Sequence, residues 1–436
     1  MIIYFQQPVV DYSNLEAKIE HLEKLLARSN DHIIRLRNEV AEANENYKAA
    51  VSKLTDTKGE QRTSDEDQEK IDPIPVLVFV CNRPRALKQH VDKLLNLVIF
   101  RYRPNAENYP IIISQDCDNN EVAEIAQGYG SSVQYIKHLS GDKANITVAS
   151  GHQRYLTYYM IARHYKLGLT HVFNRLNYSS VIITEDDLDI APDFFEYFRA
   201  TRRLLDKDPT LYCVSAWNDN GKSNLIDSDA TDLLYRSDFF PGLGWMMTKT
   251  LWDELGPIWP NGFWDDWIRD PLRRKNRACI RPEISRTAMT KEGRKGASKG
   301  LFFTKHLAKI QLNTQPANFS GRSMEYLIKK NYDEPFLDSV YSASVTNLPS
   351  LRRLILEASP GDYRIEYTTL SDYLSIADSL QIMRDFKAGV PRTAYFGIVT
   401  CFINRMRIYV APDRFTWSGY NQSWEAPDNP HDLAQL

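Results

Sequence analysis

The spacing of apolar residues changes twice along the chain. From residue 14 to about 56, apolar side chains recur at alternating spacings of four and three, with charged residues between them and neither Gly nor Pro. This heptad pattern predicts a coiled-coil stem, with a single solvated amphipathic helix as the alternative. The polar, charge-rich stretch from Thr55 to Asp72 indicates a linker. We therefore expect residues 1–72 to form a stem and its linker.

Short buried-strand patterns alternate with amphipathic helical patterns from residue 73 onward. Strand patterns occupy residues 75–81, 109–114, 133–136 and 179–184, and helical patterns occupy residues 86–95, 120–128 and 154–166. Strands separated by helices predict an α/β fold with a mostly parallel, doubly wound sheet that is covered on both faces. We expect this domain to extend over residues 73–290.

The pattern differs again beyond residue 330. A helix is expected at residues 368–387, and strands are expected at residues 364–367, 393–401 and 407–410. These elements predict a smaller α+β domain over residues 330–436. Residues 291–329 are then expected to form a lid loop and an interdomain linker.

Charged side chains stand where the predicted strands of the first sheet end. Arg83 and Asp116 follow the first two strands, and three consecutive acids at 185–187 follow the strand at 179–184. Ligands of open α/β sheets bind beyond the carboxyl ends of the strands. Acids at the end of a buried strand are costly without water, hydrogen bonds or a cation, and a divalent metal with a diphosphate would receive them. The alternative is a helix start, with Asp193 as its cap.

Three further segments carry candidate chemistry. The string at 263–267 (FWDDW) sets two acids among aromatic rings, where a carboxylate could act as a general base, although a helix N-terminus explains it equally well. The Gly-rich basic stretch at 293–300 could close over a phosphate or form a solvated turn. His164, on the helix before the acidic strand, is more typical of a structural histidine than of a ligand contact.

Composition narrows the choice of partners only slightly. The formal net charge of -2 gives no reason to expect a nucleic acid partner, and 43% hydrophobic residues are ample for a core. Because no apolar run reaches about 18 residues, any targeting segment is expected to lie outside this sequence. Five scattered cysteines without a C-x-x-C pair leave both buried thiols and long-range disulfides open, with a slight preference for thiols.

Longer strings of the sequence resemble a known family. They occupy residues 183–198, 214–221, 238–245, 263–267 and 278–287. In these strings the chain resembles the N-acetylglucosaminyltransferase I family, and the likeness covers roughly residues 74–425. The resemblance implies a GT-A-type nucleotide-sugar-binding fold, an inverting reaction, dependence on Mn²⁺ and residence in the Golgi.

The resemblance also implies roles for single residues. Asp187 would be the metal ligand, Asp186 would face the nucleotide ribose, Glu185 would lie near the transferred sugar, and Asp265 would be the catalytic base. Further contacts with the nucleotide sugar would come from Arg83, Asp116, His164, Trp264 and Ser298. The family's disulfides would pair Cys81 with Cys117 and Cys213 with Cys279, and Cys401 would remain without a partner.

The activity implied by this family is transfer of GlcNAc from UDP-GlcNAc, in β-1,2 linkage, to the α-1,3-arm mannose of a high-mannose N-glycan, which starts hybrid and complex glycans. Two alternatives stay open: the same transfer to an O-linked mannose, and a catalytically silent glycan-binding protein. Because the family's transmembrane helix is not in this sequence, a Golgi-lumenal, type II membrane location follows from kinship alone. Self-association through the stem is inferred from its heptads.

Overall fold

The structure is a computed structural model that describes residues 72–96, 106–296, 300 and 302–415. The chain divides into two compact units, Met1–Lys70 and Ile71–Leu436, and every described residue belongs to the second. The expected coiled-coil stem and Ser298 lie outside the described residues. Within the described ranges, every helix is too short or too polar to span a bilayer.

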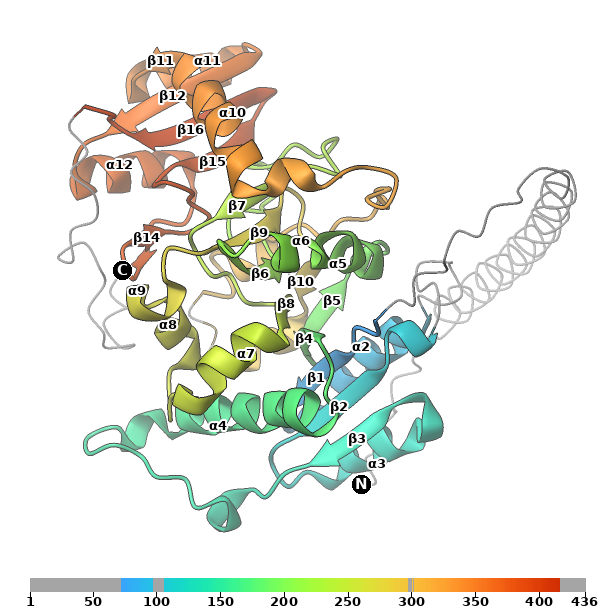
Figure 1. Ribbon diagram of the computed structural model, residues 1–436. Helices are drawn as coiled ribbons and strands as arrows, with labels where there is room; N and C mark the ends of the chain where they lie inside the picture. Colours follow the sequence, from blue (N-terminus) through green and yellow to red (C-terminus); the bar gives the residue numbers. More distant parts are fainter. Residues whose placement is uncertain (1–71, 97–105, 297–299, 301, 416–436) are drawn as a thin grey trace, which may run out of the picture. The chain divides into compact units, whose positions relative to one another are not determined.

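An eight-stranded mixed sheet forms the centre of the described region (Figure 1). Its strands, in spatial order, are β3 (Gln134–Lys137), β2 (Ile111–Gln115), β1 (Val76–Val80), β4 (Ser180–Glu185), β8 (Trp245–Thr248), β6 (Leu211–Ser215), β9 (Ala278–Pro282) and β7 (Leu234–Ser237). The first four strands are mutually parallel, as are β6 and β9, whereas β8 and β7 run antiparallel to their neighbours. The α/β class predicted from the sequence is confirmed.

Helices and short helical turns connect these strands. The α-helices are α2 (Pro84–Asn96), α3 (Asn120–Gly128), α4 (Leu156–Thr170), α5 (Phe194–Arg202), α6 (Leu204–Lys207), α7 (Lys249–Leu255), α8 (Trp264–Arg269), α9 (Pro271–Arg274), α10 (Lys329–Ser342), α11 (Leu348–Glu357) and α12 (Leu370–Leu380). A π-helical turn, His171–Arg175, extends α4. The 3-10 turns are Ala106–Asn108, Gly130–Ser132, Gly141–Ala144, Gln153–Tyr155, Gly256–Ile258, Lys291–Lys295, Leu307–Lys309 and Glu325–Leu327.

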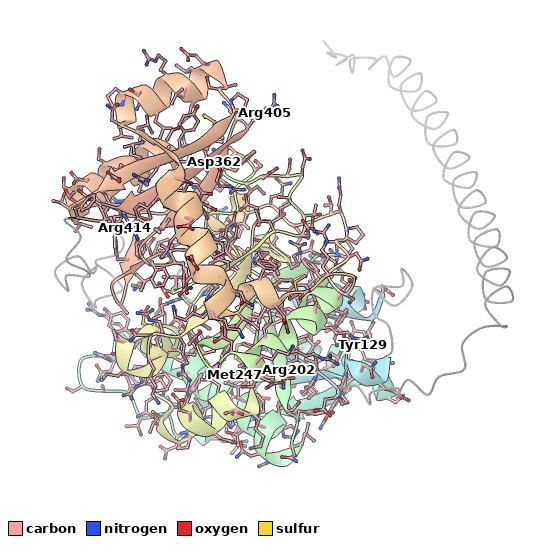
Figure 2. All side chains as sticks on the ribbon, turned by 45° about the horizontal axis from the view of Figure 1, so that its top comes forward. Tyr129, Arg202, Met247, Asp362, Arg405 and Arg414 are labelled. Atoms are coloured by element: carbon pink, nitrogen blue, oxygen red, sulfur yellow. A yellow bond between two sulfur atoms is a disulfide. The ribbon has the colours of Figure 1, made fainter. Side chains whose placement is uncertain are left out.

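Strand β1 faces two hydrophobic cores at once. Val76, Val78 and Val80 pack in a cluster with α2, α3 and α5, whereas Leu77 and Phe79 pack in a second cluster with α4 and α7. Side chains of a strand alternate between the faces of a sheet, so a strand covered on both faces must be apolar at every position. This explains the continuous apolar run that marked the strand in the sequence. In Figure 2, Met247 of β8 is labelled among the side chains of the second cluster.

A second, four-stranded sheet follows in the C-terminal part of the described region. It consists of β11 (Ser344–Thr346), β12 (Gly361–Tyr367), β16 (Met406–Pro412) and β15 (Val399–Ile403), of which only β15 is antiparallel to its neighbour. Helices α11 and α12 pack with this sheet in a cluster of their own. Two two-stranded sheets complete the fold, β5 (Leu188–Ile190) with β10 (Thr287–Met289), and β13 (Phe386–Lys387) with β14 (Val390–Pro391). The domain boundaries expected at residues 290 and 329 stay predictions.

Two elements of the C-terminal part are shorter than the sequence predicted. The helix expected at 368–387 ends at Leu380, because Gln381 turns into a left-handed conformation (φ 61°) and its N–H closes the last turn. The strand expected at 393–401 begins only at Val399, because Thr393 and Phe396 both have positive φ values, of 67° and 53°. Both errors arise at left-handed residues that are not glycine and therefore leave little trace in the sequence.

Two disulfides link strands of the eight-stranded sheet or their ends. Cys81, just after β1, is bonded to Cys117, just after β2, and Cys213 of β6 is bonded to Cys279 of β9, its partner in the strand register. Cys401 is buried and free. The pairing implied by the family resemblance is confirmed, and the slight preference for buried thiols was wrong for four of the five cysteines.

Candidate functional site

The acid triplet lies at the carboxyl end of β4, beside Arg83, which is three positions after the end of β1. Glu185 is the last residue of β4, and Asp186 and Asp187 occupy the turn before β5. Since β4 pairs with β1, Arg83 lies next to these acids. Its Nε and Nη2 atoms donate to the two oxygens of Asp186, and its Nη1 donates to Oδ2 of Asp187 at 2.6 Å. One guanidinium group thus contacts two of the three carboxylates.

The triplet carries more negative charge than Arg83 compensates. Burial and the charge of Asp187 raise the pKa of Glu185 to about 7, although Tyr165 and Arg83 oppose the shift. Burial also raises the pKa of Asp186 to about 7, against the attraction of Arg83. A buried carboxyl group with a raised pKa is one that an added cation would stabilise in its charged form.

Asp187 has the geometry of a ligand that lacks a partner. Its Oδ1 atom is buried and has no hydrogen-bond partner in the described part of the chain. Its carbonyl oxygen accepts from the N–H of Thr290, which holds the turn Lys291–Lys295 nearby. A Cβ atom at Gly293 would clash with the side chain of Met289 and would lie 3.4 Å from Oδ2 of Asp187, so glycine allows this turn to pack against Met289, near the carboxylate.

The residues present fit a divalent metal only with ligands from elsewhere. Among the described residues, no group of three or more His, Cys, Asp or Glu side chains could hold a metal ion. Asp187 by itself offers a buried, unsatisfied oxygen, and a hard cation such as Mg²⁺ or Mn²⁺ takes the rest of its shell from water and substrate phosphates. The site therefore fits an ion that arrives with, or is completed by, a diphosphate.

Asp116 and His164 are engaged at the end of β2. Asp116, 3% exposed, accepts from Arg163 at 3.2 Å, and burial raises its pKa although Arg163 opposes this. His164 is buried and its Nε2 lies 3.0 Å from Oγ of Ser114. Burial holds the pKa of His164 well below its ordinary value, so the ring is neutral. The imidazole is thus a satisfied buried group in this structure, and neither residue lines the cavity described below.

Tyr165 connects the acid triplet to the FWDDW string, a link that the sequence did not reveal. Its hydroxyl donates to Oε1 of Glu185 at 2.8 Å, and its ring stacks on Trp264 with centroids 4.2 Å apart. Phe79 stacks on the other side at 4.1 Å. Tyr165 is one helical turn in α4 from Ile161, so helical periodicity marked it only as a core position.

The FWDDW string forms the start of α8, as the alternative interpretation expected. Phe263 has a left-handed conformation (φ 54°), a strained state for an aromatic residue, and its ring stacks on Tyr158 with centroids 5.0 Å apart. Asp265 and Asp266 occupy the first turn of the helix. Their side chains are 46% and 42% exposed, so the aromatic rings do not exclude water from them in this structure. Asp265 and Asp266 can therefore act in the site and, at the same time, interact favourably with the N-terminus of α8.

Two cations distinguish the two carboxylates of α8. Nη1 of Arg269 donates to Oδ2 of Asp265 at 3.2 Å and to Oδ1 of Asp266 at 3.0 Å. Nζ of Lys387, from β13, lies 3.3 Å from Asp266. Partial burial tends to raise the pKa of Asp266, but the charges of Arg269 and Lys387 outweigh it and lower the pKa. Asp266 is held by two cations and Asp265 by one, so Asp265 is the freer base.

One cavity of about 310 Å³ brings the acid triplet and the FWDDW string together. Of the residues expected from the sequence, Glu185, Asp187, Trp264 and Asp265 line it. The rest of its wall consists of Tyr158, Ile161, Tyr165, Asp219, Phe240, Pro241, Gly242, Leu243, Phe263, Asp266, Arg269, Met289, Gly293, Gly296, Phe302, Leu307, Met383, Lys387 and Arg392. Asp186 and Arg83 do not line the cavity, but the guanidinium group of Arg83 hydrogen-bonds to both Asp186 and Asp187.

Several charged residues of this wall escaped the sequence analysis. Arg269 follows Asp265 by four positions on one helix, a spacing that signals a side-chain pair. Arg392 binds Asp219 at 2.8 Å and Asp385 at 2.7 Å, and Lys387 binds Asp266 from 121 positions away. No local pattern announces contacts over such separations.

Solved structures show remote likenesses to this chain. Residues 1–349 of TarS from S. aureus share 10% identity, with 66% of this chain and 79% of that chain covered and a TM-score of 0.34. The mannosyltransferase PcManGT from Pyrobaculum calidifontis, solved with GDP-Man and Mn²⁺, shares 14% identity, with 69% and 84% covered and a TM-score of 0.32.

Sequence comparison finds a relative with much higher identity to this chain. An α-1,3-mannosyl-glycoprotein 2-β-N-acetylglucosaminyltransferase of Arabidopsis thaliana is 38% identical over 352 residues, which are 80% of this chain and 76% of that protein. The family model described as the GNT-I family matches residues 6–424. The family match covers the acid triplet, the FWDDW string and the strands of both disulfides, on an α/β fold of the class that the sequence motifs implied. The chain therefore belongs to the GNT-I family, the N-acetylglucosaminyltransferase I family.

Proposed function

We propose that the protein is an inverting glycosyltransferase that moves GlcNAc from UDP-GlcNAc to the α-1,3-arm mannose of a high-mannose N-glycan, in β-1,2 linkage. Family membership supports the chemistry. One structural observation carries the proposal: a single cavity is lined both by Glu185 and Asp187, at the end of β4, and by Trp264 and Asp265, at the start of α8. A donor site and a base can thus act on one substrate pair.

The donor is proposed to bind at the acid end of the cavity. Asp187, with its unsatisfied Oδ1, would hold Mn²⁺, which when bound supplies positive charge against the diphosphate of the departing UDP. Asp186 would face the ribose and Glu185 the transferred sugar. Contacts with the nucleotide sugar are further proposed for Arg83, Asp116, His164, Trp264 and Ser298.

Asp265 is proposed as the base. The 2-hydroxyl of the acceptor mannose has too high a pKa to attack unaided, so it must lose its proton as its oxygen bonds to C1 of GlcNAc. The proton passes to Asp265, the bond between C1 and the UDP oxygen breaks, and the single displacement turns an α linkage into a β linkage. The weaker cation pairing of Asp265, compared with Asp266, supports this assignment.

The turn Lys291–Lys295 is proposed as part of a lid that limits hydrolysis of the donor. Its Gly293 passes close to Asp187, and Gly293 and Gly296 line the cavity. A cover at this position would exclude water from the bond that is cleaved.

We also infer that the protein acts in the Golgi lumen as a type II membrane protein. Family kinship supports this location. The two disulfides support it as well, because such bonds persist in oxidising compartments. Self-association through residues 1–72 stays part of this proposal.

The decisive experiment offers labelled UDP-GlcNAc with two acceptors, a high-mannose N-glycan and an O-mannosyl peptide, with Mn²⁺ and with EDTA. We expect transfer to the N-glycan that requires Mn²⁺, and linkage analysis should show β-1,2-GlcNAc. Preference for the O-mannosyl peptide would replace the proposed acceptor. Glycan binding without transfer would instead indicate a catalytically silent binding protein.

A further inference from the structure

Part of the cavity wall comes from the C-terminal part of the chain, far in sequence from the acid triplet. Met383, Lys387 and Arg392 line it, from the segment after α12 and from the β13–β14 hairpin. Lys387 is the member of this group that contacts the acids of α8. A residue of the C-terminal part thus reaches the carboxylate next to the proposed base.

The charges around Lys387 balance. Its Nζ lies 3.3 Å from both carboxylate oxygens of Asp266. Arg269 binds the same carboxylate at 3.0 Å and that of Asp265 at 3.2 Å. Two positive and two negative side chains therefore meet here, whereas the end of the cavity at Glu185 and Asp187 is acidic. A charge-balanced wall with many donors and acceptors suits a neutral, hydroxyl-rich ligand better than it suits a diphosphate.

Lys387 also has bonding capacity to spare. An ammonium group has three N–H donors, and in the described part of the chain Nζ of Lys387 pairs only with the carboxylate of Asp266. Its side chain is 17% exposed and lines the cavity. Because Asp266 holds Nζ in place, little rotamer freedom would be lost when a further hydrogen bond forms.

We propose that Lys387 is a specificity-determining residue that donates a hydrogen bond to a hydroxyl of the mannoside acceptor while Asp266 holds its ammonium group. This inference rests on the proposed function and names one contact of its acceptor subsite. The C-terminal part of the chain would then contact the acceptor directly. The contact would not involve the nucleotide, which belongs at the acid end.

The rival explanation is that Lys387 only fastens the β13–β14 hairpin to α8 through Asp266. The two explanations differ in a double-mutant cycle. If Lys387 contacts the acceptor, Lys387→Met raises the acceptor KM in the wild-type protein and also, by a smaller factor, in an Asp266→Asn background, where Nζ keeps its donors but loses the carboxylate that holds it. If it acts only through Asp266, the same substitution has no further effect once Asp266 is changed.

The experiment measures steady-state transfer from UDP-GlcNAc to a mannose-terminated N-glycan, with the affinity for UDP-GlcNAc in Mn²⁺ measured by calorimetry. Loss of a hydrogen bond from a charged donor should raise the acceptor KM about tenfold or more in Lys387→Met, and by a smaller but measurable factor in the Asp266→Asn background. UDP-GlcNAc affinity should stay within about twofold. Lys387→Arg, which keeps the donors, should recover part of the loss. Lys330→Met, at an exposed lysine of α10, is the matched control.

The outcomes separate this inference from the function on which it rests. An acceptor KM that is unchanged in Lys387→Met, or changed only when Asp266 is intact, would overturn the inference while wild-type transfer upholds the function. An equal loss of UDP-GlcNAc affinity would place Lys387 with the donor and would also overturn it. Failure of the wild-type protein to transfer GlcNAc to any mannoside would overturn both. Circular dichroism of each variant checks that the fold is intact.

Discussion

Nη1 of Arg83 donates a hydrogen bond to Oδ2 of Asp187 at 2.6 Å, while Oδ1 of the same carboxylate is buried without a partner in the described part of the chain. One oxygen of Asp187 is therefore satisfied by the protein, and the other is available to a ligand. Burying a carboxylate oxygen without a partner is costly, so a fold tolerates it where a ligand completes the site. This relationship identifies Asp187, rather than its neighbours, as the residue whose loss is most informative.

Substitution of Asp187 by Asn should abolish Mn²⁺-dependent binding of UDP-GlcNAc, because an amide oxygen carries no charge for the cation. Calorimetry of UDP-GlcNAc binding, with Mn²⁺ and with EDTA, measures this. The control is Asp189→Asn, since Asp189 lies two positions away but is half-exposed and paired with Lys93. Unchanged affinity of Asp187→Asn in Mn²⁺ would remove the residue from the metal site.

The two carboxylates of α8 should respond differently to the same substitution. Asp265→Asn preserves shape but removes the proton acceptor, so turnover should fall roughly 10²-fold or more while UDP-GlcNAc affinity is nearly retained. Asp266→Asn should cost much less, because Asp266 is already bound to Arg269 and Lys387. Steady-state kinetics on both variants tests this. An inactive Asp266 variant beside an active Asp265 variant would move the base to Asp266.

Mass spectrometry after alkylation can show which cysteines are free thiols and which form disulfides. Without reduction, alkylation of the native protein should label no cysteine of the two disulfides, and Cys401 should react only after unfolding because it is buried. Labelling of three or more cysteines would contradict the pairing and weaken the lumenal location.

Loss of the bridge between β6 and β9 should be costly. Replacing Cys213 and Cys279 together by Ala should lower the free energy of unfolding by about 2–5 kcal/mol, the usual range for a structural disulfide. Denaturant titration of the double variant against the wild-type protein measures the difference. Replacing Cys401 by Ser is not a suitable control, because that thiol is buried in the core of the second sheet; Cys401→Ala is the better comparison.

Buried His90 should make the protein less stable in mild acid. Burial lowers its pKa to about 4, although a hydrogen bond with the carbonyl of Leu188 opposes the shift. In the unfolded chain the histidine has its ordinary pKa and binds a proton below about pH 6.5. In the folded protein the same side chain stays unprotonated until the pH approaches 4. The contribution of His90 is therefore full above pH 6.5 and is lost as the pH falls toward 4, by roughly 3 kcal/mol at most.

The test compares the slope of the unfolding free energy against pH in the wild-type protein and in His90→Gln. Between pH 6.5 and 4.5 the unfolding free energy of the variant should fall less steeply with pH than that of the wild-type protein. The difference in slope should correspond to at most one proton bound on unfolding, whatever the difference in stability between the two proteins at neutral pH. Equal slopes would show that His90 titrates normally in the folded state. Comparing slopes also cancels the constant cost of the altered contacts with Thr184 and Leu188.

Local patterns in the sequence determined much of this protein. The unbroken apolar run of β1 follows from burial on both faces of a parallel sheet, so it was visible without a structure. The acid triplet was recognisable because charge directly after a buried strand is unusual and the end of such a strand is where ligands bind. Strings of residues that resemble those of the family, such as 183–198 and 263–267, indicated the family. Each of these signals is contained within a short stretch of chain.

Tertiary structure alone decided which groups face one another. Lys387 meets Asp266 across 121 positions, and the hydroxyl of Tyr165 reaches Glu185 from a helix whose periodicity marks that residue only as core. The hydrophobic period of an element fixes which side is buried, but it carries no information about which distant side chain shares that burial. The early end of α12 and the late start of β15 likewise depend on left-handed residues whose partners are far away in the sequence: the carbonyl of Gln381 accepts from Lys222, and the N–H of Phe396 donates to Asp238. The sequence determined the chemistry available at the strand ends, and packing determined the wall around it.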